Sequence, residues 1–144
     1  MTRPTPRASR GASRAGPARR ITVIGAGTMG HGIAQVCALA GHAVTLADTS
    51  ADIAAHGVER IRANLDGAVE RGKLTPVDHE RTLARIRTLA DTTAACRDAD
   101  IVIEAVPERL DVKLDVLARI EQSAPPGAVI ATNTSSLSIN EMQT

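Results

Sequence analysis

The sequence predicts an α/β fold in which helices cover both faces of a parallel β-sheet. Four short apolar runs have the β-branched character of strands that are buried on both faces, at 21–24, 43–47, 101–103 and 129–131. Stretches with helical spacing of apolar residues separate these runs, and parallel strands need such crossover connections. The expected architecture is a Rossmann-like, doubly wound parallel sheet.

The first unit of this fold is a strand, a glycine loop and a helix. The run Ile21–Ile24 ends at Gly25, and apolar residues then recur at helical spacing over 29–40. A second strand over 43–47 ends at Asp48. We therefore expect two parallel strands joined by a helix at the start of the sheet.

Between the second and third apolar runs the pattern indicates two helices in succession. Helical stretches are expected at about 50–70 and 76–87, and Gly72 followed by Pro76 is typical of a helix end and a new helix start. We interpret this segment as a helical hairpin inserted between strands. A further helix is expected at about 109–122, before the last run.

The amino-terminal segment differs in composition from the rest of the chain. Residues 1–20 contain six arginines, no acidic residue and almost no large apolar side chain, so we expect a disordered basic arm. A transit peptide or a twin-arginine signal would share this composition, but the stretch after Arg20 is broken by glycines and favours a strand and a loop. The 144 residues leave room for one compact domain, over 21–144.

Composition excludes several classes of function. The chain has no Phe, Trp or Tyr, so it cannot form an aromatic stacking platform. Beyond the basic arm, acidic residues outnumber basic ones, and no nucleic-acid partner is expected. No apolar run approaches the ~20 residues that cross a bilayer, so no membrane partner is expected either. Cys37 and Cys96 lack metal-ligand spacing, and we expect reduced thiols, no metal and a cytoplasmic location.

The glycine loop carries the first chemical prediction. It has the pattern G-x-G-x-x-G directly after a strand and at the start of a helix. In this pattern Gly25 permits the tight turn, Gly27 lets backbone approach a pyrophosphate, and Gly30 allows close packing of helix and strand. The alternative is a glycine-rich turn without a ligand. We predict that the loop binds a dinucleotide through Gly25, Ala26, Gly27, Thr28, Met29 and Gly30.

Asp48 decides which dinucleotide is expected. An acidic side chain at the end of the second strand can accept hydrogen bonds from both hydroxyls of the adenosine ribose. The same carboxylate repels the 2′-phosphate of NADP. NAD is therefore the predicted cofactor.

Three motifs occur in order along the chain. They are IGAGTMGHGIAQ at 24–35, VIEAVPE at 102–108 followed by Lys113, and ATNTSSLSI at 131–139. Together they resemble the amino-terminal domain of the L-3-hydroxyacyl-CoA dehydrogenases, which include the bacterial 3-hydroxybutyryl-CoA enzymes. The resemblance covers about residues 21–139 and includes the helical hairpin.

The resemblance implies NAD as cofactor, an acyl-CoA as substrate and hydride transfer at the 3-hydroxy group, in fatty-acid metabolism. It implies that Glu108 and Lys113 lie beside the nicotinamide ribose. Asn133 and Ser135 would lie where cofactor and acyl substrate meet, with Ser135 as a substrate-positioning residue in catalysis. Read from the residues alone, Glu108 is equally a solvated helix-cap acid and Ser135 a helix N-cap.

The same resemblance places Asn64 and Arg71, on the helical hairpin, in contact with CoA. Arg71 could pair with a CoA phosphate through two hydrogen bonds. The alternative for Arg71 is a solvated surface side chain.

The family's general base is a histidine oriented by a glutamate, and both would follow the third motif. The chain's own histidines are expected to be surface or packing residues: His31, His42, His56 and His79. We therefore expect a domain that is incomplete at its carboxyl end and that self-associates or meets a carboxyl-terminal dehydrogenase domain in trans. Two alternatives remain, an NAD-binding module without catalysis and a relative that acts on a small hydroxy acid such as gulonate.

Overall fold

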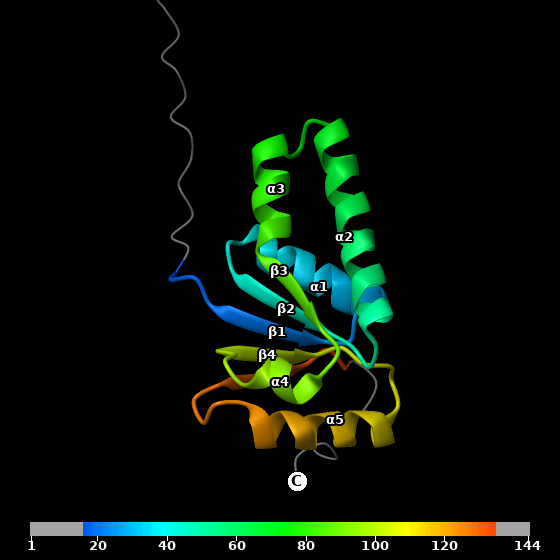
Figure 1. Cartoon of the computed structure of the whole chain (residues 1–144), viewed down its shortest axis with the longest axis vertical. Coiled ribbons are helices and arrows are strands. Elements are labelled where there is room, and N and C mark those ends of the chain that lie inside the picture. Colours follow the sequence, from blue (N-terminus) through cyan, green and yellow to red (C-terminus); the bar gives the residue numbers. More distant parts are fainter. Residues whose placement is uncertain (1–15, 135–144) are drawn as a thin grey trace, which may run out of the picture.

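The computed structural model describes residues 16–134. Five parallel strands form one sheet in the order β3-β2-β1-β4-β5 (Figure 1). The strands are β1 (Arg20–Ile24), β2 (Ala43–Ala47), β3 (Ile86–Leu89), β4 (Ile101–Glu104) and β5 (Val129–Thr132). The order reverses direction between β1 and β4, as in doubly wound folds, so the predicted Rossmann-like architecture is confirmed.

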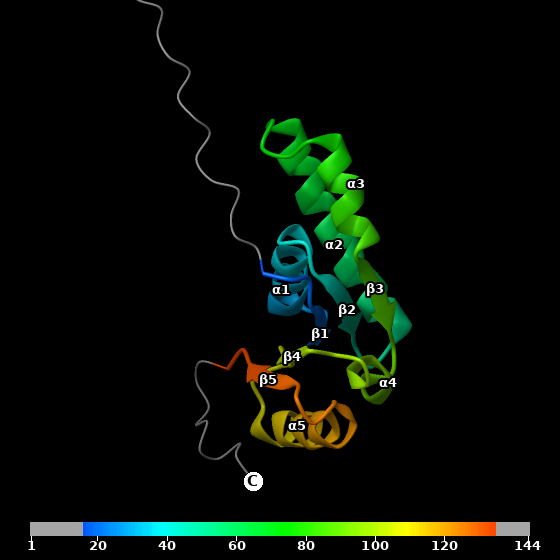
Figure 2. The ribbon, with the colours of Figure 1, turned by 90° about the vertical axis from the view of Figure 1, so that its left-hand side faces the viewer.

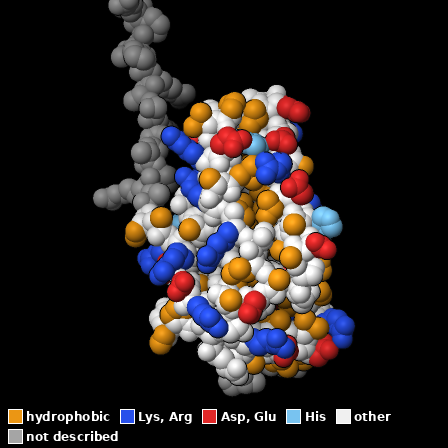
Figure 3. All heavy atoms as spheres, viewed as in Figure 1, with side chains coloured by type: hydrophobic (Ala, Val, Ile, Leu, Met, Phe, Trp, Pro, Cys, Tyr) orange, Lys and Arg blue, Asp and Glu red, His pale blue; other side chains and the backbone are white. Residues whose placement is uncertain are grey.

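Helices cover both faces of this sheet. Figures 1 and 2 both place α1 (Thr28–Leu39) and α2 (Ala51–Glu70) on one face and α4 (Thr92–Cys96) and α5 (Leu110–Ser123) on the other. Within residues 16–134, no helix combines the length and apolarity needed to cross a membrane. On the face shown in Figure 3, acidic and basic side chains lie interspersed among apolar ones.

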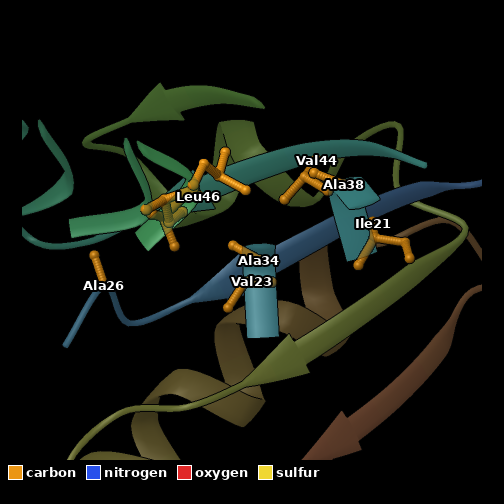
Figure 4. Close-up of a cluster of buried hydrophobic side chains, with 9 residues drawn as sticks. Ile21, Val23, Ala26, Ala34, Ala38, Val44 and Leu46 are labelled. Atoms are coloured by element: carbon orange, nitrogen blue, oxygen red, sulfur yellow. The ribbon is translucent and has the colours of Figure 1, made fainter. Parts of the chain in front are cut away.

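The alternation of side chains along β1 divides the core into two clusters. Ile21 and Val23 pack on one face against Ala34 and Ala38 of α1 (Figure 4). Ile24 belongs to the second cluster, on the face covered by α4 and α5. Because successive strand residues point to opposite faces, a continuous apolar run serves both clusters.

The helix α2 and the helix α3 (Pro76–Ala84) form the predicted hairpin, which rises away from the sheet (Figures 1 and 2). Gly72 adopts φ 67° after α2, and the Thr75 hydroxyl accepts a hydrogen bond from the backbone N–H of Asp78 at the start of α3. His79 lies nearly buried between the helices, with Nε2 2.7 Å from Oδ1 of Asp66. The helix end and new start expected at Gly72 and Pro76 are confirmed.

The predicted boundary of the second hairpin helix is wrong. The helix expected to reach residue 87 ends at Ala84, and Ile86–Leu89 forms the edge strand β3. The pairing of β3 with β2 satisfies the backbone groups on the side of β2 that faces away from β1, starting with the bond from Val44 N–H to the carbonyl of Arg85 (2.8 Å). The short helix α4, which begins at the N-cap Asp91, was also missed, because a single turn shows no helical period.

Two glycines fix the passage from β1 into α1. Gly25 has φ 103°, and a Cβ there would lie 2.6 Å from the carbonyl oxygen of Ala105. A Cβ on Gly30 would lie 1.6 Å from the carbonyl oxygen of Gly25. The turn and the first turn of α1 therefore touch through backbone atoms alone.

The close backbone contact at Gly30 predicts that alanine substitutions at two glycines of α1 will change stability in opposite directions. Gly30→Ala should lower the free energy of unfolding by about 2 kcal/mol or more, because backbone must move to admit the methyl group. Gly32→Ala is the matched control, since its Cβ would meet no atom within 4 Å. There the better helix propensity of alanine should raise stability by up to ~1 kcal/mol. Urea denaturation measures both, and equal effects would contradict the packing described.

Candidate functional site

A pocket of about 650 Å³ lies at the carboxyl ends of β1, β2 and β4. Its walls are the glycine loop, Asp48 and Thr49 after β2, residues 105–108 after β4, and Asn133 after β5. Ligands of open parallel sheets bind at this edge, where the strand order changes direction. A second hollow, of about 520 Å³, lies at the amino ends of the strands, and none of the predicted site residues lines it.

The glycine loop leaves open space above the start of α1. Gly27 is the N-cap residue of α1, has no side chain to cap the helix, and would place a Cβ within 4 Å of no other atom. The first turn carries no acidic side chain. The first backbone N–H groups of a helix lack intrahelical acceptors and favour an anion, so this end of α1 fits a pyrophosphate.

Asp48 is anchored to the glycine loop from the end of β2. Its Oδ2 accepts a hydrogen bond from the backbone N–H of Ala26 at 2.8 Å. Its Oδ1 accepts from the N–H (2.7 Å) and the hydroxyl (3.2 Å) of Thr49. A carboxylate has about four acceptor positions, so these three bonds leave about one open to a ribose hydroxyl, and rotation of the Thr49 hydroxyl would free a second for the other hydroxyl of the diol. Asp48 therefore holds a fixed negative charge at the pocket wall.

A buried ion pair underlies the wall after β4. The side chains of Glu104 and Lys113 are both fully buried, and Lys113 Nζ lies 2.8 Å from Oε1 of Glu104. The same Oε1 accepts from the N–H of Val106 (2.7 Å), and Oε2 accepts from the hydroxyl of Thr132 at the end of β5. Sequence reasoning did not identify Glu104 as a site residue. The sequence feature that could have identified it is an acidic side chain at the end of an otherwise apolar strand.

The structure brings Glu108 and Asn133 to the pocket but leaves Lys113 behind its wall. Glu108 lines the pocket and accepts a hydrogen bond from the hydroxyl of Thr134 at 2.8 Å. Lys113 does not line the pocket, and its ammonium lies 3.3 Å from Oε1 of Glu108. The N–H of Asn133 donates to the carbonyl of Glu104 (2.8 Å). Lys113 thus reaches the pocket only indirectly, through its ion pairs and its hydrogen bond to the carbonyl of Val106.

Two of the other predicted residues, Asn64 and Arg71, do not line this pocket. Asn64 of α2 donates to Oε1 of Gln35 on the neighbouring helix α1 (3.0 Å), and Arg71 is the exposed C-cap residue of α2. Ser135 lies outside the described residues. No histidine of 16–134 lines the pocket, and no group of three His, Cys, Asp or Glu in that part of the chain could hold a metal ion. Contact of Asn64 and Arg71 with CoA stays a prediction.

Apolar side chains complete the pocket, and sequence reasoning missed them. Ile53 of α2 and Val112 and Val116 of α5 lie along its lining. Nothing distinguishes these residues from ordinary core positions until the two helices are placed at the same edge of the sheet. A mostly apolar pocket with a few fixed polar groups is the usual character of a cofactor site.

Comparison with known proteins also identifies most of the chain as a cofactor-binding domain. Residues 20–144 match the family model described as the NAD-binding domain of 3-hydroxyacyl-CoA dehydrogenase. The chain is 47% identical to the 3-hydroxyadipyl-CoA dehydrogenase of Escherichia coli, over 83% of this chain and 25% of that protein. It is 37% identical to a probable 3-hydroxybutyryl-CoA dehydrogenase of Bacillus subtilis, over 86% of this chain and 43% of that protein.

A solved structure shows the same fold. The (S)-3-hydroxybutyryl-CoA dehydrogenase of Ralstonia eutropha superposes with a TM-score of 0.83 at 38% identity, over 88% of this chain and 44% of that one. The chain thus spans between a quarter and a half of the length of these relatives. With the family model matched from β1 onward, the chain belongs to the 3-hydroxyacyl-CoA dehydrogenase family, as its NAD-binding domain.

Proposed function

We propose that this chain binds NAD in the pocket at the carboxyl ends of the strands. It would act as the cofactor-binding domain of a 3-hydroxyacyl-CoA dehydrogenase. The observation that carries the proposal is the pairing of the open cradle at Gly27 with the anchored carboxylate of Asp48. One group fits a pyrophosphate and the other fits a ribose diol. When bound, NAD would accept the hydride from C3 of the hydroxyacyl group, and the hydroxyl proton would pass to a base.

Different residues of the chain would bind different parts of the cofactor. The start of α1 would hold the pyrophosphate, and Asp48 would orient the adenosine ribose. The wall formed by residues 105–108 and by Asn133 lies across the pocket from Asp48 along the sheet edge, because β1 separates β2 from β4. This wall would therefore face the nicotinamide half, with Glu108 as its charged side chain.

The proposed substrate class rests on the relatives, on Asn64 and Arg71, which do not line the pocket, and on Ser135, which lies outside the described residues. The relatives named above are acyl-CoA dehydrogenases by description, which supports an acyl-CoA substrate here. Asn64 and Arg71 on the exposed hairpin would contact CoA, and Ser135 would position the acyl group. No histidine of 16–134 lines the pocket, and we propose that the general base belongs to a carboxyl-terminal domain, as the family resemblance implies.

The Asp48 carboxylate should set the preference for NAD over NADP. Asp48→Ser should weaken NAD binding about tenfold or more, because hydrogen bonds to a charged acceptor are lost. The same change should weaken NADP binding less or strengthen it, since a repulsive charge is removed. Isothermal titration calorimetry measures both affinities. Equal affinity of the unaltered chain for the two cofactors would contradict this role.

Gly27→Val should abolish binding of NAD without unfolding the chain. The added side chain would occupy the open space over the loop, where the pyrophosphate must approach. Gly127→Val is the matched control, because this glycine also has open space around it but lies before β5, outside the pocket lining. Thermal midpoints of both variants should stay near that of the unaltered chain. Retained NAD affinity in Gly27→Val would show that the dinucleotide lies elsewhere.

The 144-residue chain alone should not oxidise 3-hydroxybutyryl-CoA at a measurable rate. Loss of a positioned acid-base group typically costs about 10²- to 10⁴-fold. The absorbance of NADH follows the reaction, and addition of a carboxyl-terminal dehydrogenase domain of a relative in trans should raise the rate. NADH production by the pure chain, abolished in Ser135→Ala, would mean that this chain contains its own base. NAD binding with no activity even in trans would favour a module without catalysis.

A further inference from the structure

The buried carboxylate of Glu104 lies behind the pocket, and no group of a ligand could reach it there. Its side chain has no exposed surface, and it does not line the pocket. It nevertheless contacts every segment that forms the wall across from Asp48. Any effect of this charge on cofactor binding must therefore act through those segments.

Three segments meet on Glu104. Through Oε1 it accepts from the N–H of Val106, which fixes the loop after β4, and from Nζ of Lys113 on α5. Through Oε2 it accepts from the hydroxyl of Thr132 at the end of β5. Its backbone carbonyl accepts from the N–H of Asn133. One residue therefore sets the relative positions of the loop, the helix and the last described strand.

Lys113 extends this network to the pocket surface. Its ammonium donates to the carbonyl of Val106 (3.2 Å) and pairs with Glu108, whose side chain is 43% exposed and lines the pocket. Thr132 acts in the same way on the other side, because its hydroxyl oxygen accepts from the N–H of Thr134 (3.2 Å). Glu108 is thus held by Lys113 and by Thr134, which are both linked to the Glu104 carboxylate, whereas Asn133 is held by the backbone carbonyl of Glu104 and follows Thr132 directly.

A buried charge of this kind is costly unless its partners are all in place. Removing either the carboxylate or the hydroxyl of Thr132 leaves a neighbour without its partner inside the protein, and the segments are then free to shift. The adenosine side of the pocket has separate supports, since Asp48 is held by Ala26 and Thr49. A change at Glu104 should therefore affect one half of the pocket and spare the other.

We propose that Glu104, through Lys113 and Thr132, is a positioning residue for the nicotinamide half of the NAD site. It shapes the wall formed by residues 105–108 and Asn133 without touching the cofactor. The inference rests on the proposed function, because it assigns that wall to the nicotinamide half.

The test compares affinities for NAD and for AMP, which carries only the adenosine half of the cofactor. Glu104→Gln should raise the Kd for NAD by about tenfold or more while the Kd for AMP changes less than about twofold. A merely structural role would weaken both ligands together. If Glu104→Gln does not fold, the same two affinities are measured for Thr132→Val, which removes the hydroxyl that donates to Glu104. Thr132→Ser keeps that hydroxyl and should restore NAD affinity.

Thr22→Val is the matched control for Thr132→Val. Thr22 is a buried strand threonine whose hydroxyl donates to the carbonyl of Ala95 (2.6 Å), away from the pocket. It should lower stability and leave the ratio of NAD to AMP affinity unchanged. Parallel losses for both ligands in the Glu104 or Thr132 variant, or no loss, would overturn the inference. If the unaltered chain binds AMP and NAD with equal affinity, the inference about Glu104 is overturned but the proposed function is not. If the unaltered chain binds neither ligand, the proposed function is overturned as well.

Discussion

The close approach of α1 to the end of β1 is the constraint on which the site depends. Gly25 and Gly30 allow the first turn of the helix to touch the strand end through backbone atoms. The N–H groups at the start of α1 are thereby brought to the sheet edge where the strand order changes direction, between β1 and β4. Asp48 can then reach the N–H of Ala26, so loop and acid form one unit. Cofactor recognition follows from how tightly these backbones pack.

The other half of the pocket is organised by charge rather than by close backbone contact. Glu104 and Lys113 are buried together, and their hydrogen bonds join the loop after β4, the helix α5 and the end of β5. Breaking a buried ion pair by removing one partner is usually strongly destabilising, so the position of this wall depends on both residues. The pocket therefore combines a backbone cradle with a wall fixed by one ionic network.

Sequence reasoning recovered the parts that depend on local pattern. The strand–glycine loop–helix unit, the hairpin marked by Gly72 and Pro76, and the order of the elements all carry short-range signals. The strand β3 was missed because Ile86–Leu89 is short and becomes a strand only by pairing with β2. The burial of Lys113 was missed because a lysine on a helix is usually solvated, and only the placement of Glu104 opposite it explains its position.

The central claim is that NAD lies across the carboxyl ends of the strands, with its pyrophosphate at the start of α1. Titration of the isotope-labelled chain with NAD, followed by the backbone amide signals in NMR spectra, tests this most directly. The account predicts saturable shifts at Gly27, Thr28 and Asp48 and at Asn133 across the pocket. Saturable shifts confined to the hollow at the amino ends of the strands, around Arg87, or no saturable shift at all, would contradict it.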